Sequence, residues 1–283
     1  MPVDYSPVGA TVADGVYRTD LDNDPLTGLR HDVGFHIQSN DLAASFVVSP
    51  SSVKIFAAME PMRARMPSYL PVAFKPIVVD ISNFIARIQQ KAGVSAERSN
   101  GITNWQLAIK ITRLSFCFGT DPKGVAAQIF TESKFDRQRV SGTGAVGLTQ
   151  MTGSAIDEVN DQLGNRGGNG ATPQNLAYLH GAINCYMGGQ SFKPMFEAGI
   201  IGRGALVSRS TPARLRAKTW LQDNVDRDLI YGQITLKVML GYARGEGATG
   251  FAAYLKAFKK YNGEPRGRDM RYARENLATM KLI

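Results

Sequence analysis

One acidic side chain of this sequence is placed to act as a general acid. Glu132 lies near the end of segment 125–133, where Val125, Ile129 and Phe130 predict a largely apolar helix. The sequence after Glu132 turns basic and then rich in glycine. A carboxyl group at the end of an apolar helix, beside a tight loop, is partly withdrawn from water, which raises its pKa. We therefore expect Glu132 to stay protonated near neutrality and to donate a proton to a substrate.

Three glycines follow this acid and favour close approach of the backbone to a ligand. Gly142, Gly144 and Gly147 have no Cβ and can adopt positive φ. Taken alone, these residues predict a candidate acid beside a ligand-binding loop. A solvated glutamate before an ordinary loop is the alternative interpretation.

No other group of residues competes with this constellation. The three histidines, His31, His36 and His180, form no metal-ligand pattern, and the sequence has no phosphate-binding loop and no Ser-His-Asp order. Cys117 and Cys185 lie 68 residues apart in apolar, helix-like sequence, so we expect buried free thiols. We expect no metal and no cofactor.

The segment around Glu132 resembles the signature of the soluble lytic transglycosylases, a lysozyme-like family of the goose-type lysozyme superfamily. The matching residues fall in register without a gap: Glu132, Ser133, Phe135, Ser141, Gly144, Ala145, Gly147, Leu148 and Gln150. Weaker matches follow at Asp228, Leu229, Gly232 and Leu236, at Tyr261-Asn262-Gly263, and in a closing helix from Tyr272. The resemblance covers about 120–283, interrupted by roughly 70 unmatched residues between Gly153 and Asn224.

This resemblance implies cleavage of the β-1,4 bond between N-acetylmuramic acid and N-acetylglucosamine in peptidoglycan, leaving a 1,6-anhydro end. One carboxyl group suffices for that reaction. Glu132 would protonate the glycosidic oxygen and then take the proton of the muramyl C6 hydroxyl as it closes on C1. The acetamido group of the substrate can meet the positive charge at C1, so a second carboxylate is not required. Asp136 and Asp157, the nearest acids in sequence, are expected to be solvated or capping residues.

The resemblance also assigns roles to five residues around the glycan. Ser141 would hydrogen-bond the sugar or Glu132, and Gln150 would donate and accept along the glycan. The carbonyl of Met151 would accept an acetamido N–H. Tyr261 would lie across the cleft with its hydroxyl toward Glu132, and Asn262 would fix that turn.

The charge of the chain is unevenly distributed. Residues 1–50 hold seven Asp against two Arg, a net charge of −5. Residues 51–283 carry a net charge of +14, which gives the total of +9 for the chain. A basic region of this kind suits a polyanion, which could be nucleic acid, anionic lipid or the anionic bacterial cell wall. The sequence has no zinc-finger or RNP signature and no apolar stretch of about 20 residues, so we expect no nucleic-acid partner and no membrane span.

The remaining sequence predicts a mainly α protein with an extended, irregular N-terminal arm. We expect the arm over 1–75, a helical lead-in over 76–119, and a lysozyme-like domain over 120–283 with an insertion at about 153–224. Helices are expected at about 76–92, 104–118, 154–163, 226–243, 249–261 and 269–281. Three further helix starts, each a capping residue followed by proline, lie at Asp121-Pro122, Thr172-Pro173 and Thr211-Pro212.

The acidic arm and the lack of a signal peptide at the start of the sequence favour a bacteriophage protein. We expect a virion enzyme of the tail or baseplate, which docks to other subunits through its arm and acts on the host periplasmic wall. A free endolysin is the first alternative. A goose-type hydrolase and a non-catalytic structural protein that keeps the fold are the others.

Overall fold

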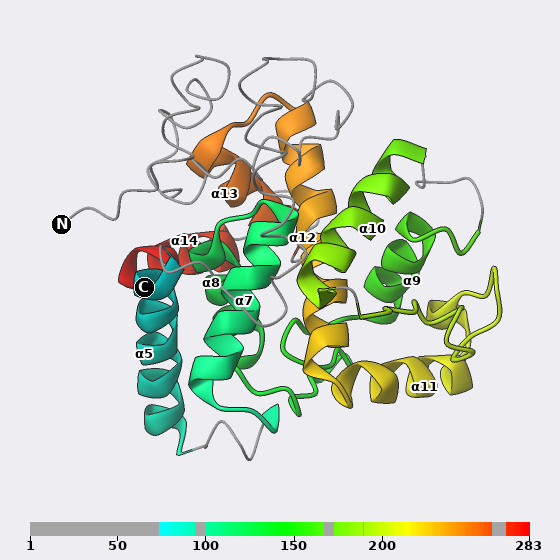
Figure 1. Cartoon of the computed structure of the whole chain (residues 1–283), viewed down its shortest axis with the longest axis horizontal. Helices are drawn as coiled ribbons and strands as arrows, with labels where there is room; N and C mark the ends of the chain where they lie inside the picture. Colours follow the sequence, from blue (N-terminus) through cyan, green and yellow to red (C-terminus); the bar gives the residue numbers. More distant parts are fainter. Residues whose placement is uncertain (1–73, 94–99, 167–172, 189, 262–269) are drawn as a thin grey trace.

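The computed structural model describes residues 74–93, 100–166, 173–188, 190–261 and 270–283, and in these ranges the protein is mainly α-helical (Figure 1). Nine α-helices and one short 3-10 helix make up the regular structure of the described residues. The expected fold class is confirmed at this level. The arm expected over 1–75 lies outside the described residues, except for Phe74 and Lys75. None of the described helices combines the length and apolar character needed to cross a bilayer.

The first two helices end at glycines, as the sequence predicts. α5 (Lys75–Ala92) stops at Gly93 and α7 (Asn104–Phe118) stops at Gly119, and both glycines adopt the left-handed conformation, at φ 65° and 57°. Such a residue ends a helix because its N–H turns back to carbonyls of the last turn. At the other end of α7, the side chain of Thr103 caps the helix.

The three proline starts each open a helix: α8 (Pro122–Ser133), α10 (Pro173–Met187) and α11 (Thr211–Gln222). Asp121 caps α8 by accepting the N–H of Lys123 at 2.8 Å. The cap of α11 is Ser210 rather than the expected Thr211, so the proline occupies the second helical position. A one-residue shift of this kind leaves the direction of the helix unchanged.

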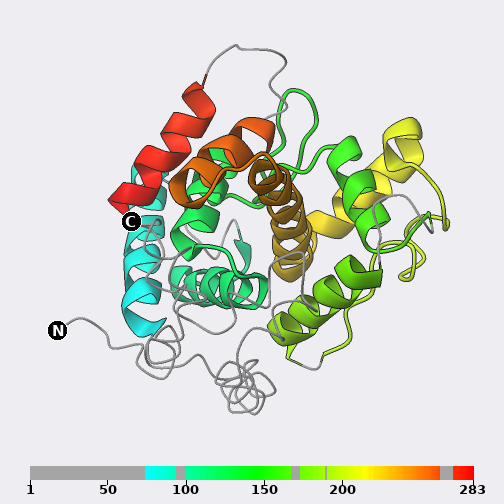
Figure 2. The same ribbon diagram turned by 90° about the horizontal axis from the view of Figure 1, so that it is seen from above.

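α12 (Val225–Gly245) is the central helix. It packs against α7, α9 (Gly153–Gln162), α11 and α13 (Gly250–Tyr261), and Figures 1 and 2 show it running between these helices. Every residue from 228 to 237 is buried, including Leu229, Ile230 and Ile234 at 0% exposure. A helix that is buried on all sides lies inside the core.

The lead-in helices belong to the same core as the segment that carries Glu132. Ile81 of α5 and Ile111 of α7 lie in one buried cluster with Ile129 of α8. α14 (Arg271–Leu282) packs against α8 and α13. Glu132 is therefore supported by helices from both ends of the described chain.

The region expected as an insertion, 153–224, is joined to α12 through a buried tyrosine. The Tyr231 hydroxyl donates to Oδ1 of Asn160 on α9 at 2.7 Å and accepts the N–H of Met195 at 3.2 Å. Its ring also meets Trp220 of α11 edge to face, with 5.6 Å between ring centroids. This region is packed onto the core.

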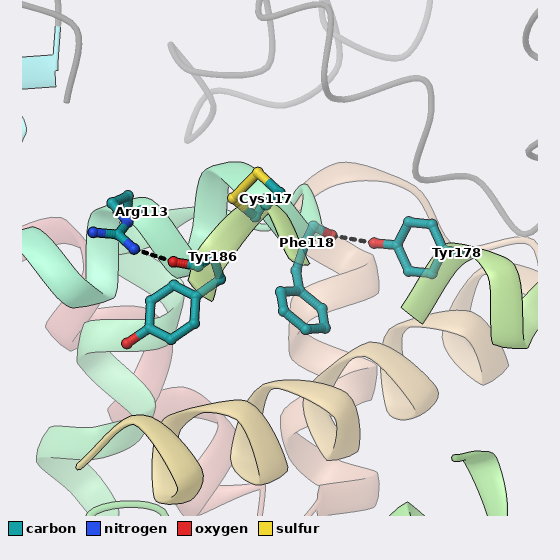
Figure 3. Close-up of a disulfide and its surroundings, with 6 residues drawn as sticks. Arg113, Cys117, Phe118, Tyr178 and Tyr186 are labelled. Carbon is teal, nitrogen blue, oxygen red and sulfur yellow. Dashed lines mark hydrogen bonds between the residues drawn. A yellow bond between two sulfur atoms is a disulfide. The ribbon is translucent and has the colours of Figure 1, made fainter. Parts of the chain in front are cut away.

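The two cysteines form a disulfide, so the expectation of free thiols is wrong (Figure 3). Cys117 lies near the end of α7 and Cys185 near the end of α10, with their Cα atoms 5.7 Å apart. A separation of 68 residues in sequence carries no information about distance in space. The two helices pack side by side, which brings the Cα atoms within the range of a disulfide.

Two hydrogen bonds accompany the disulfide between α7 and α10. The Tyr178 hydroxyl donates to the carbonyl of Phe118 at 2.6 Å, and the Arg113 guanidinium donates to the carbonyl of Tyr186 (Figure 3). The Tyr186 hydroxyl also donates to Asp226 of α12, at 2.5 Å. α10 is thus held at both of its ends.

Candidate active site

Glu132 lies in the last turn of α8, where the backbone leaves the helix through two unusual residues. Lys134 and Phe135 adopt left-handed conformations, at φ 59° and 64°, although neither is glycine. Such a conformation costs of order 1 kcal/mol per residue for side chains of this kind and persists only where the surroundings enforce it. The Phe135 ring, which is fully buried against Phe84 and Phe130, supplies part of that support.

The rest of the support comes from Asn100, which precedes α7. Its side-chain amide donates to the carbonyl of Phe135 at 2.8 Å and accepts the N–H of Arg137 at 3.1 Å. Asn100 is only 2% exposed. A buried amide that satisfies one donor and one acceptor of the same loop fixes the path of that loop. Asn100 thereby positions the backbone directly after Glu132.

The carboxyl group of Glu132 is partly buried and receives a hydrogen bond from Tyr272. Desolvation raises the pKa of Glu132 to about 7, against the opposing effects of the Tyr272 hydrogen bond and of the charges on Arg139 and Lys134. The Tyr272 hydroxyl, on α14, donates to Oε1 of Glu132. At neutral pH a large fraction of Glu132 therefore carries a proton, the state that a general acid needs.

Tyr261, at the end of α13, lies beside the same carboxyl group but uses its hydroxyl differently. That hydroxyl donates to the carbonyl of Thr149 at 2.9 Å. Burial, followed by the charges of Glu132 and Asp228, raises the pKa of Tyr261 well above its ordinary value. The Tyr261 hydroxyl therefore joins α13 to the loop that follows Glu132, whereas the hydrogen bond to Glu132 itself comes from Tyr272.

The glycine-rich segment forms a tight, doubled-back loop. Val146 pairs with Val140 and with Met151 in two isolated antiparallel bridges. The Gln150 side-chain amide donates to the carbonyls of Arg139 at 3.0 Å and Gly147 at 2.9 Å, and Gln150 itself has a positive φ of 49°. These bonds close the loop at its base.

The carboxylate of Asp228, on α12, binds the middle of this loop. One carboxylate oxygen accepts the N–H of Leu148 at 2.6 Å, and the other accepts the Thr149 hydroxyl at 2.7 Å and the Thr149 N–H at 3.3 Å. Asp228 is completely buried, and desolvation raises its pKa to about 6 against these hydrogen bonds. Its position explains Gly147, because a Cβ there would lie 2.3 Å from the carboxylate.

Gly232 lies one turn after Asp228 on the same face of α12 and serves the same loop. A Cβ on Gly232 would lie 2.2 Å from the side chain of Thr149. Any larger residue would force the loop away from the helix. Because residues four apart share one face of a helix, Asp228 offers Thr149 a hydrogen-bond acceptor and Gly232 leaves space for its side chain.

The structure brings four of the predicted site residues, Glu132, Gln150, Met151 and Tyr261, to one part of the fold, around a buried Thr149. The Met151 side chain is buried, and its carbonyl already accepts the N–H of Val146 at 3.3 Å. Ser141 lies at the turn of the loop, where its hydroxyl accepts the N–H of Ala145 at 2.9 Å. Asn262 lies outside the described residues.

The two acids nearest to Glu132 in sequence hydrogen-bond the backbone elsewhere in the fold. Asp136 accepts the N–H of Gln138 at 2.9 Å, and Asp157 accepts the N–H groups of Val207 at 2.6 Å and Ser208 at 3.0 Å. Asp136 closes a turn of the loop, whereas Asp157 is buried within α9 and binds a distant segment, so the expectation of a solvated or capping residue is wrong for Asp157. In the part of the chain that the structure describes, no three side chains of the metal-binding types gather at one point.

Three residues of the site were not assigned roles from the sequence: Asn100, Asp228 and Tyr272. The last two fall within the weaker parts of the resemblance and could have been found there. Asn100 precedes the resemblance, and nothing in its local sequence signals its role. Comparisons with known proteins add no assignment, because no family model, no curated protein and no solved structure matches this chain.

Proposed function

We propose that this protein is a peptidoglycan lytic transglycosylase with a lysozyme-like catalytic domain. The observation that carries the proposal is the partly buried Glu132 carboxyl group, whose pKa is raised to about 7 and which accepts a hydrogen bond from Tyr272. The in-register resemblance of 132–150 to the soluble lytic transglycosylases supplies the reaction. The substrate is the glycan strand of the cell wall.

In the proposed reaction Glu132 acts twice. Protonated Glu132 gives its proton to the glycosidic oxygen as the bond to muramyl C1 breaks. The resulting carboxylate then takes the proton of the muramyl C6 hydroxyl while that oxygen bonds to C1, which yields the 1,6-anhydro ring and restores the acid. Tyr272 donates to Oε1, which leaves Oε2 to carry the transferred proton.

Among the residues that the structure describes, the acids near Glu132 favour a lyase over a hydrolase of the inverting type. A hydrolase of the inverting type requires a second carboxylate about 6.5–9.5 Å away that activates a water molecule. Asp228 is completely buried, and its two oxygens accept three hydrogen bonds, so it has no room for a water molecule. Glu275, which acts on Lys134 together with Glu132, is exposed and forms an ion pair with Arg271.

The decisive experiment combines two matched variants with product analysis. Glu132→Gln keeps the shape of the side chain but has no dissociable proton, so glycan cleavage is expected to fall at least about 100-fold. Glu275→Gln serves as the control and is expected to retain activity. Mass spectrometry of the released muropeptides should show 1,6-anhydro ends.

Other outcomes would point to the alternatives. Reducing ends, together with loss of activity in Glu275→Gln, would indicate a goose-type hydrolase. Near wild-type cleavage by Glu132→Gln would remove Glu132 from the mechanism. No release of muropeptides by the wild-type chain would indicate a structural protein that keeps this fold.

For its biological setting we propose a phage tail or baseplate enzyme that acts on the host periplasmic wall. The acidic sequence of 1–50 supports docking to other virion subunits, and the disulfide between Cys117 and Cys185 supports a site of action outside the reducing cytosol. The truncated chain that tests docking should start at Phe74 and keep this residue, since Phe74 is buried against Phe116. Virion particles that incorporate the truncated chain normally would rule out docking through the arm.

A further inference from the structure

Two cations of α11 lie against the loop that follows Glu132. Arg214 and Lys218 are four residues apart and therefore share one face of the helix. The Lys218 ammonium nitrogen lies 2.8 Å from the point that a Cβ on Gly144 would occupy, so it covers the turn of the loop. Gly144 has a φ of 79°, and the absent side chain leaves this space to the ammonium group.

Neither cation is neutralised within the described residues. The ion pairs there involve other lysines and arginines. Arg214 donates one N–H to the carbonyl of Ser208, and its Nε is buried without a hydrogen-bond partner. Asp157, the acid that also contacts Ser208, is occupied by the backbone at Val207 and Ser208. The pair thus keeps unused donors and an uncompensated charge.

This arrangement is unfavourable until an anion joins it. Two like charges on one face of a helix repel each other, and a buried N–H without a partner carries a desolvation cost. In agreement, partial burial and then the charge of Arg214 lower the pKa of Lys218. Lys218 remains partly exposed, and Gly142 and Thr143 of the turn are exposed, so a ligand can reach the ammonium group from solvent.

We propose that Arg214 and Lys218 form a subsite for a carboxylate on the peptide side chain of the glycan substrate. This proposal rests on the proposed function. In peptidoglycan the peptide hangs from the muramyl sugar, the same sugar whose bond is cleaved, so its carboxylates lie close to the reacting atoms. A planar guanidinium and a compact ammonium together offer the directed donors that a carboxylate takes. The subsite selects glycan that carries peptides over bare glycan.

The test compares two substrates that differ only in their peptides. Cell walls freed of teichoic acid are digested intact, or after an amidase has removed the peptide side chains. Lys218→Gln and Arg214→Gln are compared with Lys91→Gln, which removes the same charge from an exposed site on α5, on the opposite side of the molecule from α11 (Figures 1 and 2). Thermal unfolding checks that each variant folds.

We expect each subsite variant to lose about tenfold in kcat/KM on intact wall, mainly through KM, as for one lost charge-assisted hydrogen bond. On peptide-free glycan the variants should equal wild type. Lys218→Arg should restore most of the activity, and Lys91→Gln should match wild type on both substrates. An equal loss on both substrates, or no loss on either, would overturn the subsite while leaving the proposed function intact.

A binding measurement separates the two proposals if the wild-type chain releases no products. The Glu132→Gln chain, with and without Lys218→Gln, is sedimented with each wall preparation. Binding that depends on both Lys218 and the peptides would support the subsite even though the proposed function had failed. Equal binding of the two chains to intact wall would overturn the subsite. Retaining teichoic acid in a third preparation shows whether phosphate competes for the same cations.

Discussion

Two regions of the molecule are held in place by different means. The turn after Glu132 is fixed by the buried amide of Asn100, and the loop above α12 is fixed by the buried carboxylate of Asp228. α10, in contrast, is fixed by the disulfide between Cys117 and Cys185 in addition to side-chain hydrogen bonds to backbone carbonyls. The candidate site thus relies on directed polar contacts to its backbone, whereas the region beyond it also has a covalent link.

The polar contacts set the position of a loop, whereas the disulfide mainly adds to the stability of the fold. A buried polar group that binds backbone N–H and carbonyl groups sets the position of a loop to within a hydrogen-bond length, and losing it leaves unsatisfied groups behind. A disulfide chiefly restricts the unfolded chain. Changes in the first region should therefore affect both folding and cleavage. Changes in the second should affect folding alone.

The largest effect is expected for Asp228→Ala. The substitution leaves the N–H groups of Leu148 and Thr149 and the Thr149 hydroxyl without their acceptor in a buried place. The free energy of unfolding should fall by about 3 kcal/mol or more, and cleavage should be lost. Denaturant unfolding with Asp223→Ala, an exposed acid that ends α11, as control measures this effect. A stable, active Asp228→Ala chain would show that the loop does not need its buried acceptor.

The disulfide should have a smaller effect, confined to stability. It closes a loop of 68 residues, so replacing both cysteines by serine should lower the free energy of unfolding by about 2–4 kcal/mol. The cleavage rate below the unfolding transition should stay within about twofold of wild type, because α10 contributes no residue to the Glu132 site. The measurement is unfolding and cleavage with and without a reductant. A sharp loss of cleavage at unchanged stability would contradict the contrast between the two regions.

The sequence predicted most of the helices and the central acid. Proline starts, capping residues and terminal glycines are local signals, and they located α5, α7, α8 and α10. The start of α11 was displaced by one residue because Ser210 and Thr211 are both good caps. The partial burial of Glu132 and its raised pKa were predictable because its apolar helix and glycine-rich loop are neighbours in sequence.

What the sequence did not reveal depends on contacts between distant segments. The disulfide is such a contact, and so is the hydrogen bond from Tyr272 to Glu132, which joins residues 140 positions apart. Asn100 belongs to the segment expected to lead into the domain, yet its side chain fixes the turn after Glu132. Only the packing of α5, α7 and α14 around α8 brings these groups together.

Asn100→Ala tests how much of the site depends on the turn after α8. Without the amide, the carbonyl of Phe135 and the N–H of Arg137 lose their partners, and the left-handed residues Lys134 and Phe135 lose their clamp. We expect a loss of about 1–3 kcal/mol in stability. We expect kcat to fall about tenfold, because the carboxyl group of Glu132 is displaced. Unchanged kcat in a destabilised chain would show that Asn100 supports only the fold.

The smallest effect is expected for Tyr272→Phe. This substitution should shift the pH profile of cleavage more than it reduces the maximal cleavage rate. The Tyr272 hydrogen bond lowers the pKa of Glu132, so without it the pKa should rise above about 7. In the proposed mechanism cleavage requires the protonated acid, so the alkaline limb of the kcat/KM profile should move to higher pH by the same amount. An alkaline limb at the same pH as in wild type would show that Tyr272 does not affect the pKa of Glu132.

Stability measurements provide an independent check on the same group. The pKa of Glu132 is higher in the folded protein than its ordinary value of 4.5, so the folded state binds the proton more tightly. Its contribution to stability is therefore fully present below pH 4.5 and is lost as the pH rises through about 7. Wild type should lose about 1–3 kcal/mol between pH 5 and pH 8 that Glu132→Gln does not lose. In Tyr272→Phe the loss should continue to higher pH, because the carboxyl group of Glu132 in the folded protein then ionises later. Equal pH dependence in wild type and Glu132→Gln would mean that the acid is solvated and its pKa ordinary.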